Sequence, residues 1–300
     1  MTGYDALRTA AAWLDLSARG RIYATGKDRA RLLHALTTNH VQQLTPGTGC
    51  YAFFLNAQGH ILADVNLLCL EDRFLLDTEP ETRELVLHHL DKYIIADDVT
   101  LEDVTDSLAC LAVEGPGGAG LQPANSFPNV IIQPVSSTGE PGFRIFVPVA
   151  DKPALIAHLE SAGAQPATAE EARTVRLEHG IPRYSEDIFD TTLPQETRQM
   201  HAIHFAKGCY LGQEIVERIR SRGHVNRLLA KLEIEAEEPL PAGTKVHAGD
   251  AEVGEIASSA FSPARGNVVA LAYLRAQYAE PGTVLRVSNR EARTTDIRSR

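Results

Sequence analysis

A single cysteine, Cys209, stands between two glycines in the stretch KGCYLGQEIVERIR, directly ahead of a predicted helix. From Leu211 onward, apolar residues recur every four positions among charged ones, which is the pattern of an amphipathic helix. Free N–H groups at the start of a helix stabilise an anion, and Lys207 adds a nearby positive charge. The residues therefore predict a reactive thiolate, while a structural cysteine buried at a tight turn fits them equally well.

Two carboxylates lie in otherwise apolar segments, where they could bind a ligand. Asp64 belongs to YAFFLNAQGHILADVN at 51–66, which reads as two strands joined by a turn at 56–59. Alternation alone places Asp64 on an exposed face. Glu178 lies near the end of a helix that Gly180 and Pro182 terminate. If it is buried there, it could pair with the N–H groups of a heterocycle; otherwise it faces solvent.

Two further motifs resemble known sites only in part. The spacing H-x2-H-x4-C at 201–209 supplies three potential zinc ligands but matches no standard zinc motif. The stretch GPGGAG at 115–120 satisfies G-x-G-x-x-G, yet Pro123 comes too early for the long helix beneath a pyrophosphate. We therefore predict no metal site and no nucleotide site.

The elements that must position these residues fall into two kinds. Residues 73–104 read as strand, helix, strand, and 143–177 begin in the same way, which predicts an α+β region with duplicated halves. After a boundary near 222–228, short alternating runs separated by Gly, Pro and Asn predict a small β-sandwich or barrel. We expect one domain over 1–225 and a second over 226–300.

Composition limits the classes of function. The 300 residues carry a formal charge of −10, which argues against non-specific binding of nucleic acid. Apolar runs are too short for a signal peptide or a membrane span. The four cysteines are scattered without a CxxC pair, so neither a disulfide framework nor a zinc ribbon is expected. These features predict a cytoplasmic protein with reduced thiols and no membrane partner.

Several motifs together resemble one family. KGCYLGQE resembles the signature of the YgfZ-type folate-binding proteins, which are relatives of the T-protein (aminomethyltransferase) of the glycine cleavage system. The resemblance covers nearly the whole chain and extends to GKDRARLLHALTTN, GCYAFFLNAQGHILAD, VEGP, RLEHGIPRY and SSAFSPARGNVVALAYLR. It implies two α+β subdomains around a central channel that accepts tetrahydrofolate, followed by a C-terminal β-barrel. It also implies a role in maintaining iron–sulfur enzymes.

The resemblance assigns roles residue by residue. Glu178 matches the glutamate that contacts the pterin, and Asp64 matches the acid that serves folate-linked chemistry in T-proteins. T-proteins usually have two adjacent acids there, whereas this chain has Ala63 beside Asp64. The expected site has Cys209 and Asp64 as catalytic residues. Its expected substrate-binding residues are Asp64, Glu178, Tyr51, Tyr184, Lys207 and Tyr210.

Three functional hypotheses follow. The first is a tetrahydrofolate-binding accessory protein for the assembly or repair of iron–sulfur clusters, with assembly proteins or client enzymes as partners. The alternative is a folate-dependent aminomethyltransferase of the glycine cleavage type, which uses Asp64 and does not require Cys209. A third is a non-catalytic folate-storage protein.

Overall fold

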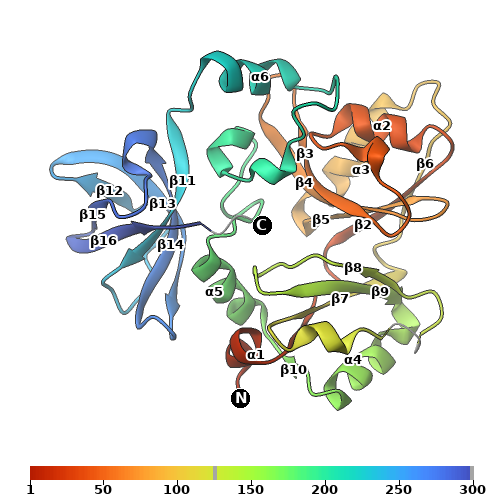
Figure 1. Ribbon diagram of the computed structural model, residues 1–300, viewed down its shortest axis with the longest axis horizontal. Helices are drawn as coiled ribbons and strands as arrows, with labels where there is room; N and C mark the ends of the chain where they lie inside the picture. The colour runs from red at the N-terminus through yellow and green to blue at the C-terminus, as the bar shows by residue number, and fades with distance from the viewer. Residues whose placement is uncertain (124–126, 298–300) are drawn as a thin grey trace.

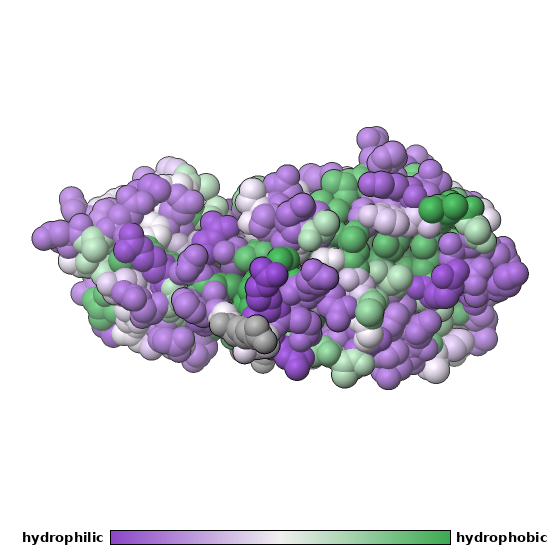
Figure 2. All heavy atoms as spheres, turned by 90° about the horizontal axis from the view of Figure 1, so that it is seen from above, coloured by the Kyte–Doolittle hydropathy of each residue, from purple (hydrophilic) through white to green (hydrophobic). Residues whose placement is uncertain are grey.

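Three lobes surround the middle of the molecule in the computed structural model, which describes residues 1–123 and 127–297 (Figure 1). Two are α+β units, each built on a five-stranded sheet, and the third is a closed barrel. The helix α5 (Ala169–His179) lies between them. Seen from above, most of the surface is hydrophilic, with smaller hydrophobic areas between the polar ones (Figure 2).

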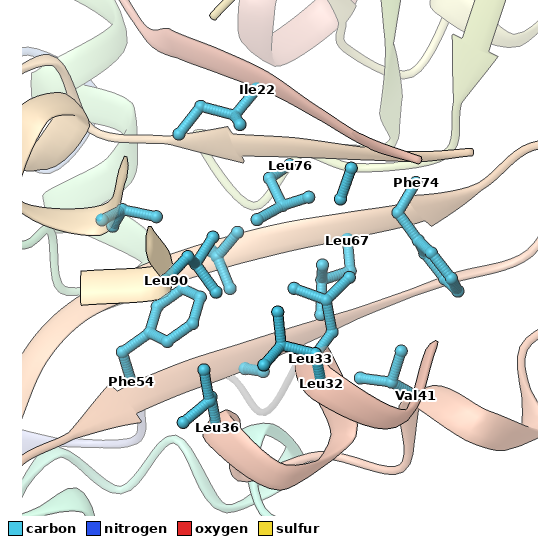
Figure 3. Packing of buried hydrophobic residues seen from close by; sticks show 14 of the residues in the cluster. Ile22, Leu32, Leu33, Leu36, Val41, Phe54, Leu67, Phe74, Leu76 and Leu90 are labelled. Carbon is cyan, nitrogen blue, oxygen red and sulfur yellow. The ribbon is translucent and has the colours of Figure 1, made fainter. Parts of the chain in front are cut away.

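The first sheet is antiparallel and carries the predicted hairpin. Its order is β3 (Gly49–Leu55), β4 (Ile61–Cys69), β5 (Phe74–Thr78), β2 (Gly20–Thr25) and β6 (Thr100–Asp103). The helices α2 (Arg29–Leu36) and α3 (Arg83–Tyr93) supply buried leucines that pack on one face of this sheet (Figure 3). The opposite face of this sheet is not covered by α2 and α3 and is directed toward the other lobes.

The second sheet is mixed and repeats the association of strands with helices. Its order is β10 (Gln165–Pro166), β1 (Ala12–Asp15), β7 (Leu108–Glu114), β9 (Gly142–Pro148) and β8 (Ile131–Gln133). Leu155 and Leu159 of α4 (Lys152–Ser161) pack against Leu111 and Ile145 in its core. The short helix α1 (Gly3–Thr9) precedes β1. The predicted α+β architecture is confirmed.

The helix α5 is well defined at both ends. Thr168 and Glu171 form a capping box at its start. Gly180 adopts φ +73° immediately after its end, a conformation that glycine tolerates best. This helix therefore ends where the sequence predicts, and it holds its residues in a fixed orientation between the lobes.

The C-terminal strands close into a six-stranded barrel, as the alternating runs predict. Their order is β11 (Arg227–Ile234), β14 (Asn267–Arg275), β13 (Ala251–Ser262), β12 (Lys245–Ala248), β15 (Val284–Val287) and β16 (Arg290–Thr295). The helix α6 (Gln213–Arg222) precedes the barrel. Short 3₁₀ turns complete the described elements: η1 (Val41–Gln43), η2 (Pro80–Thr82), η3 (Gly118–Leu121), η4 (Val149–Asp151), η5 (Pro194–Thr197), η6 (Met200–Ala202) and η7 (Ala276–Tyr278).

Candidate functional site

A cavity of about 490 Å³ lies where the two sheets meet α5. Its size is within the range of ~300–1,000 Å³ that is usual for small-molecule sites. Apolar residues such as Leu14, Leu16 and Pro182 form part of its wall. Charged and polar side chains from all three elements form the remainder, among them Tyr51, Asp64, Glu79, Arg19, Arg144, Arg173, Arg176 and Arg183. The cavity can therefore hold a ligand that combines a flat apolar part with charged groups.

Asp64 lies in β4 and faces this cavity with only 6% of its surface exposed. Tyr51 lies on the neighbouring strand β3, two positions from the residue opposite Asp64, so both side chains share one face of the sheet. The Tyr51 hydroxyl donates a hydrogen bond of 2.9 Å to Oδ2 of Asp64. Alternation predicts an exposed face for Asp64, but the face it occupies lines a cavity and not bulk solvent.

A chain of buried ion pairs forms another wall of the cavity. Nε of Arg19 lies 2.7 Å from Oδ1 of Asp77, and Arg144 of the second sheet also pairs with Asp77. Arg19 pairs in addition with Glu79, to which Arg183 contributes Nε at 2.9 Å. The network therefore joins the first sheet, the second sheet and the segment after α5.

The charges of this network are stable at neutral pH. Burial opposes ionisation of Asp77, but Arg144 and Arg19 outweigh it and hold the pKa of Asp77 below its ordinary value. Burial likewise works against the charge on Arg19, yet Asp77, Glu79 and Asp64 raise its pKa well above the usual value. Sequence reasoning missed this network; its only signal is a charged residue inside an apolar strand, such as Asp77 in FLLDT.

Two of the three predicted tyrosines do not line the cavity. Tyr184 and Tyr210 are 7% and 9% exposed and pack with Phe53 and Ile61 in a hydrophobic cluster. Burial raises the pKa of each phenol to about 12, so both stay neutral. Only Tyr51 reaches the cavity, because its position on β3 puts it on the open face of the sheet.

Glu178 is also turned away from the cavity. Its carboxylate is 1% exposed and accepts hydrogen bonds of 2.5 Å from the hydroxyls of Tyr4 and Ser262, besides an ion pair with Arg8. Arg176, two residues earlier on α5, does line the cavity. Two residues correspond to a rotation of about 200° around a helix, so Glu178 projects from the opposite side. The structure thus places this glutamate between α1 and the barrel.

Comparison with known proteins agrees with this architecture. The model of the GCVT N-terminal domain matches residues 2–124, and that of the glycine cleavage T-protein C-terminal barrel domain matches residues 227–298. An aminomethyltransferase of Rubrobacter xylanophilus is 30% identical over 290 residues, covering 90% of this chain and 78% of that protein. One of Streptomyces coelicolor is 30% identical over 310 residues, covering 93% and 82%.

The chain belongs to the glycine cleavage T-protein family.

Its fold is that of a solved family member. The crystal structure of the glycine cleavage system aminomethyltransferase T from Bartonella henselae superimposes with a TM-score of 0.88 at 20% identity, covering 98% of this chain and 88% of that one. A putative chloroplastic transferase of Arabidopsis thaliana is 24% identical over 302 residues, covering 94% of this chain and 69% of that protein. The T-protein relationship is thus established, whereas the narrower resemblance to YgfZ-type proteins stays a prediction.

In this T-protein relative, Lys207 and Cys209 have different environments. Lys207 is buried, and its Nζ donates a hydrogen bond of 2.5 Å to the carbonyl of Thr37 and another to that of His34, at the end of α2. Burial lowers the pKa of Lys207 to about 8. Cys209 is exposed and lies four residues ahead of α6, whose N-cap is Gly212. Neither residue lines the cavity, so the predicted substrate contact of Lys207 and a thiol facing a channel have no counterpart there.

Two histidines of the H-x2-H-x4-C motif in this T-protein relative contact other aromatic rings. His201 stacks on Tyr51 with ring centroids 5.4 Å apart, and His204 makes an edge contact of 5.1 Å with His40. Within residues 1–123 and 127–297, no group of three or more His, Cys, Asp or Glu side chains is arranged to hold a metal ion. No helix in those ranges is long and apolar enough to cross a membrane.

Proposed function

We propose that the chain is a tetrahydrofolate-dependent transferase of the aminomethyltransferase type, with the cavity as its folate site. The observation that carries this proposal is the buried carboxylate of Asp64, which faces the cavity and is held by Tyr51. The family relationship supports it, because the relatives in Rubrobacter and Streptomyces are aminomethyltransferases.

The residues present fit a folate. Leu14, Leu16 and Pro182 offer apolar surface to an aromatic ring system, and the arginines along the ion-pair chain offer donors to carboxylates. Bound tetrahydrofolate would supply the amine nitrogens that take up a one-carbon unit. Asp64 would hold a proton of the reacting amine, and Tyr51 would fix the direction of the Asp64 carboxylate. The buried surroundings strengthen the interaction between this carboxylate and any positive charge that develops nearby.

An isosteric substitution tests the proposal. We expect the wild type to bind tetrahydrofolate in calorimetry and to transfer to it the carbon of the aminomethyl group from a loaded lipoyl carrier protein, with release of ammonia and of the carrier as its free thiol. Asp64→Asn keeps the shape of the side chain but removes the proton acceptor. The transfer rate should therefore fall by about 100-fold or more, the usual contribution of a general base, with affinity changed much less. Asp106→Asn, at a side chain 90% exposed, is the matched control. Absence of tetrahydrofolate binding by the wild type would refute the proposal.

A role in iron–sulfur cluster maintenance is a second candidate, and the exposure of Cys209 within KGCYLGQE favours it. One cysteine cannot hold a cluster alone, so a partner protein would provide the remaining ligands. Cys50, Cys69 and Cys110 are better protected, because burial raises the pKa of each thiol.

The test of this candidate compares reactivity with biological function. Iodoacetamide at neutral pH should label Cys209 before the three strand cysteines. Cys209→Ser should still bind tetrahydrofolate but fail to restore iron–sulfur enzyme activity in cells lacking the native protein. Cys69→Ser serves as the control for a thiol in a strand. Full rescue by Cys209→Ser would eliminate this role and leave the transferase proposal intact.

A further inference from the structure

The buried carboxylate of Glu114 organises a loop of the second sheet. Glu114 ends β7 and has no exposed surface. It accepts hydrogen bonds from the Ser136 hydroxyl at 2.9 Å, the Ser137 amide at 2.6 Å and the Thr138 amide at 2.9 Å, and also from the Thr138 hydroxyl. A buried carboxylate is stable only when its oxygens are satisfied in this way. Residues 136–138 are therefore all hydrogen-bonded to the same carboxylate.

The same loop is packed closely against the end of α5. Gly139 has φ +92°, and a Cβ atom there would come within 2.5 Å of Ile181 and 2.7 Å of His179. Oε1 of the next residue, Glu140, lies 3.0 Å from Nε2 of His179. The loop is therefore held by Glu114 from one side and by α5 from the other, which leaves it little freedom to shift.

The loop at residues 136–140 forms part of the cavity wall. Ser137 and Thr138 line the cavity, and the Ser137 hydroxyl accepts a hydrogen bond of 3.1 Å from Nη2 of Arg144. Arg144 also lines the cavity and pairs with Asp77 of the first sheet. A continuous path of contacts thus leads from Glu114 through the loop to the ion pairs that continue to Arg19.

We infer that Glu114 is a positioning residue for the ligand of the cavity: it sets the wall formed by Ser137, Thr138 and Arg144 without touching the ligand itself. This inference rests on the proposed function, since tetrahydrofolate is taken as the ligand. It goes beyond that proposal because it assigns ligand affinity to a residue outside the cavity lining.

Glu114→Gln is the direct test, because it preserves size while replacing one acceptor oxygen by a donor that faces the loop amides. We expect the dissociation constant and the KM for tetrahydrofolate to rise at least 10-fold, with kcat within threefold of the wild type. Amide hydrogen exchange at residues 137–139 should become faster. Glu102→Gln, at an exposed strand position, should leave all three unchanged. Ser136→Ala, which removes a single donor to Glu114 from a residue outside the cavity lining, should show a smaller effect in the same direction.

The outcomes separate the two proposals. If the wild type binds tetrahydrofolate and both Glu114→Gln and Ser136→Ala bind it equally well, the positioning role is overturned and the proposed function stands. If Glu114→Gln does not fold, Ser136→Ala alone decides in the same way. If the wild type does not bind tetrahydrofolate, the proposed function and this inference both fall.

Discussion

Cys110 lies in the middle of β7 with no exposed surface, and its environment makes stability depend on pH. Burial, aided by the charge of Asp77, raises the pKa of this thiol from 9.0 to about 12. A group with a raised folded-state pKa stabilises the fold below its unfolded pKa, and this contribution is lost as pH rises toward the folded value. At pH 10 the ionised form of the unfolded thiol outweighs the neutral form by about ten to one, which removes on the order of 1 kcal/mol of stability.

This pH effect can be isolated by comparing slopes. The free energy of unfolding from urea titrations should decrease between pH 8 and pH 10 by about 1 kcal/mol less in Cys110→Ala than in the wild type. The alanine variant is expected to be less stable at every pH because of the space it leaves, so only the difference between the two pH values matters. Equal pH slopes in the two proteins would show that Cys110 does not carry this dependence.

At the scale of helices and strands, local sequence patterns predicted most of the architecture. The hairpin at 51–66, the termination of α5 at Gly180 and the alternating barrel strands are all local patterns, and the structure contains each of them. The helix after Cys209 begins later than Leu211, because Gly212 adopts φ +83° and makes room for the carbonyl of Asn56. Cys209 is thus outside the first turn of the helix, whereas the pattern of the sequence placed it at or just before the helix start.

The walls of the candidate site were only partly predictable. Asp64 was identified, but periodicity cannot distinguish a face that meets solvent from one that lines a cavity. Arg19 precedes β2, Asp77 lies in β5 and Arg144 lies in β9. These positions are far apart in the chain, so their ion pairs depend on how the two sheets pack. Glu114 was seen only as part of VEGP, since nothing local in that motif indicates which loop its carboxylate binds.

At the scale of the whole molecule, Glu178 connects three parts of the chain. It belongs to α5, it accepts hydrogen bonds from Tyr4 of α1 and Ser262 of β13, and it pairs with Arg8. Its backbone carbonyl also accepts a hydrogen bond of 3.2 Å from Lys231 of the barrel strand β11. The N-terminal helix, the central helix and the barrel therefore meet at this one carboxylate.

Removing this carboxylate should weaken the assembly of the lobes more than the binding of a ligand. Glu178→Ala leaves the buried hydroxyls of Tyr4 and Ser262 without their acceptor, so the free energy of unfolding should decrease by roughly 2–3 kcal/mol. Glu178→Gln, which keeps an acceptor oxygen, should lose less. Because Glu178 does not line the cavity, tetrahydrofolate affinity measured by calorimetry below the unfolding transition should stay within threefold of the wild type in both variants. A variant of wild-type stability that no longer binds tetrahydrofolate would instead support direct contact between Glu178 and the pterin, as the family resemblance implies.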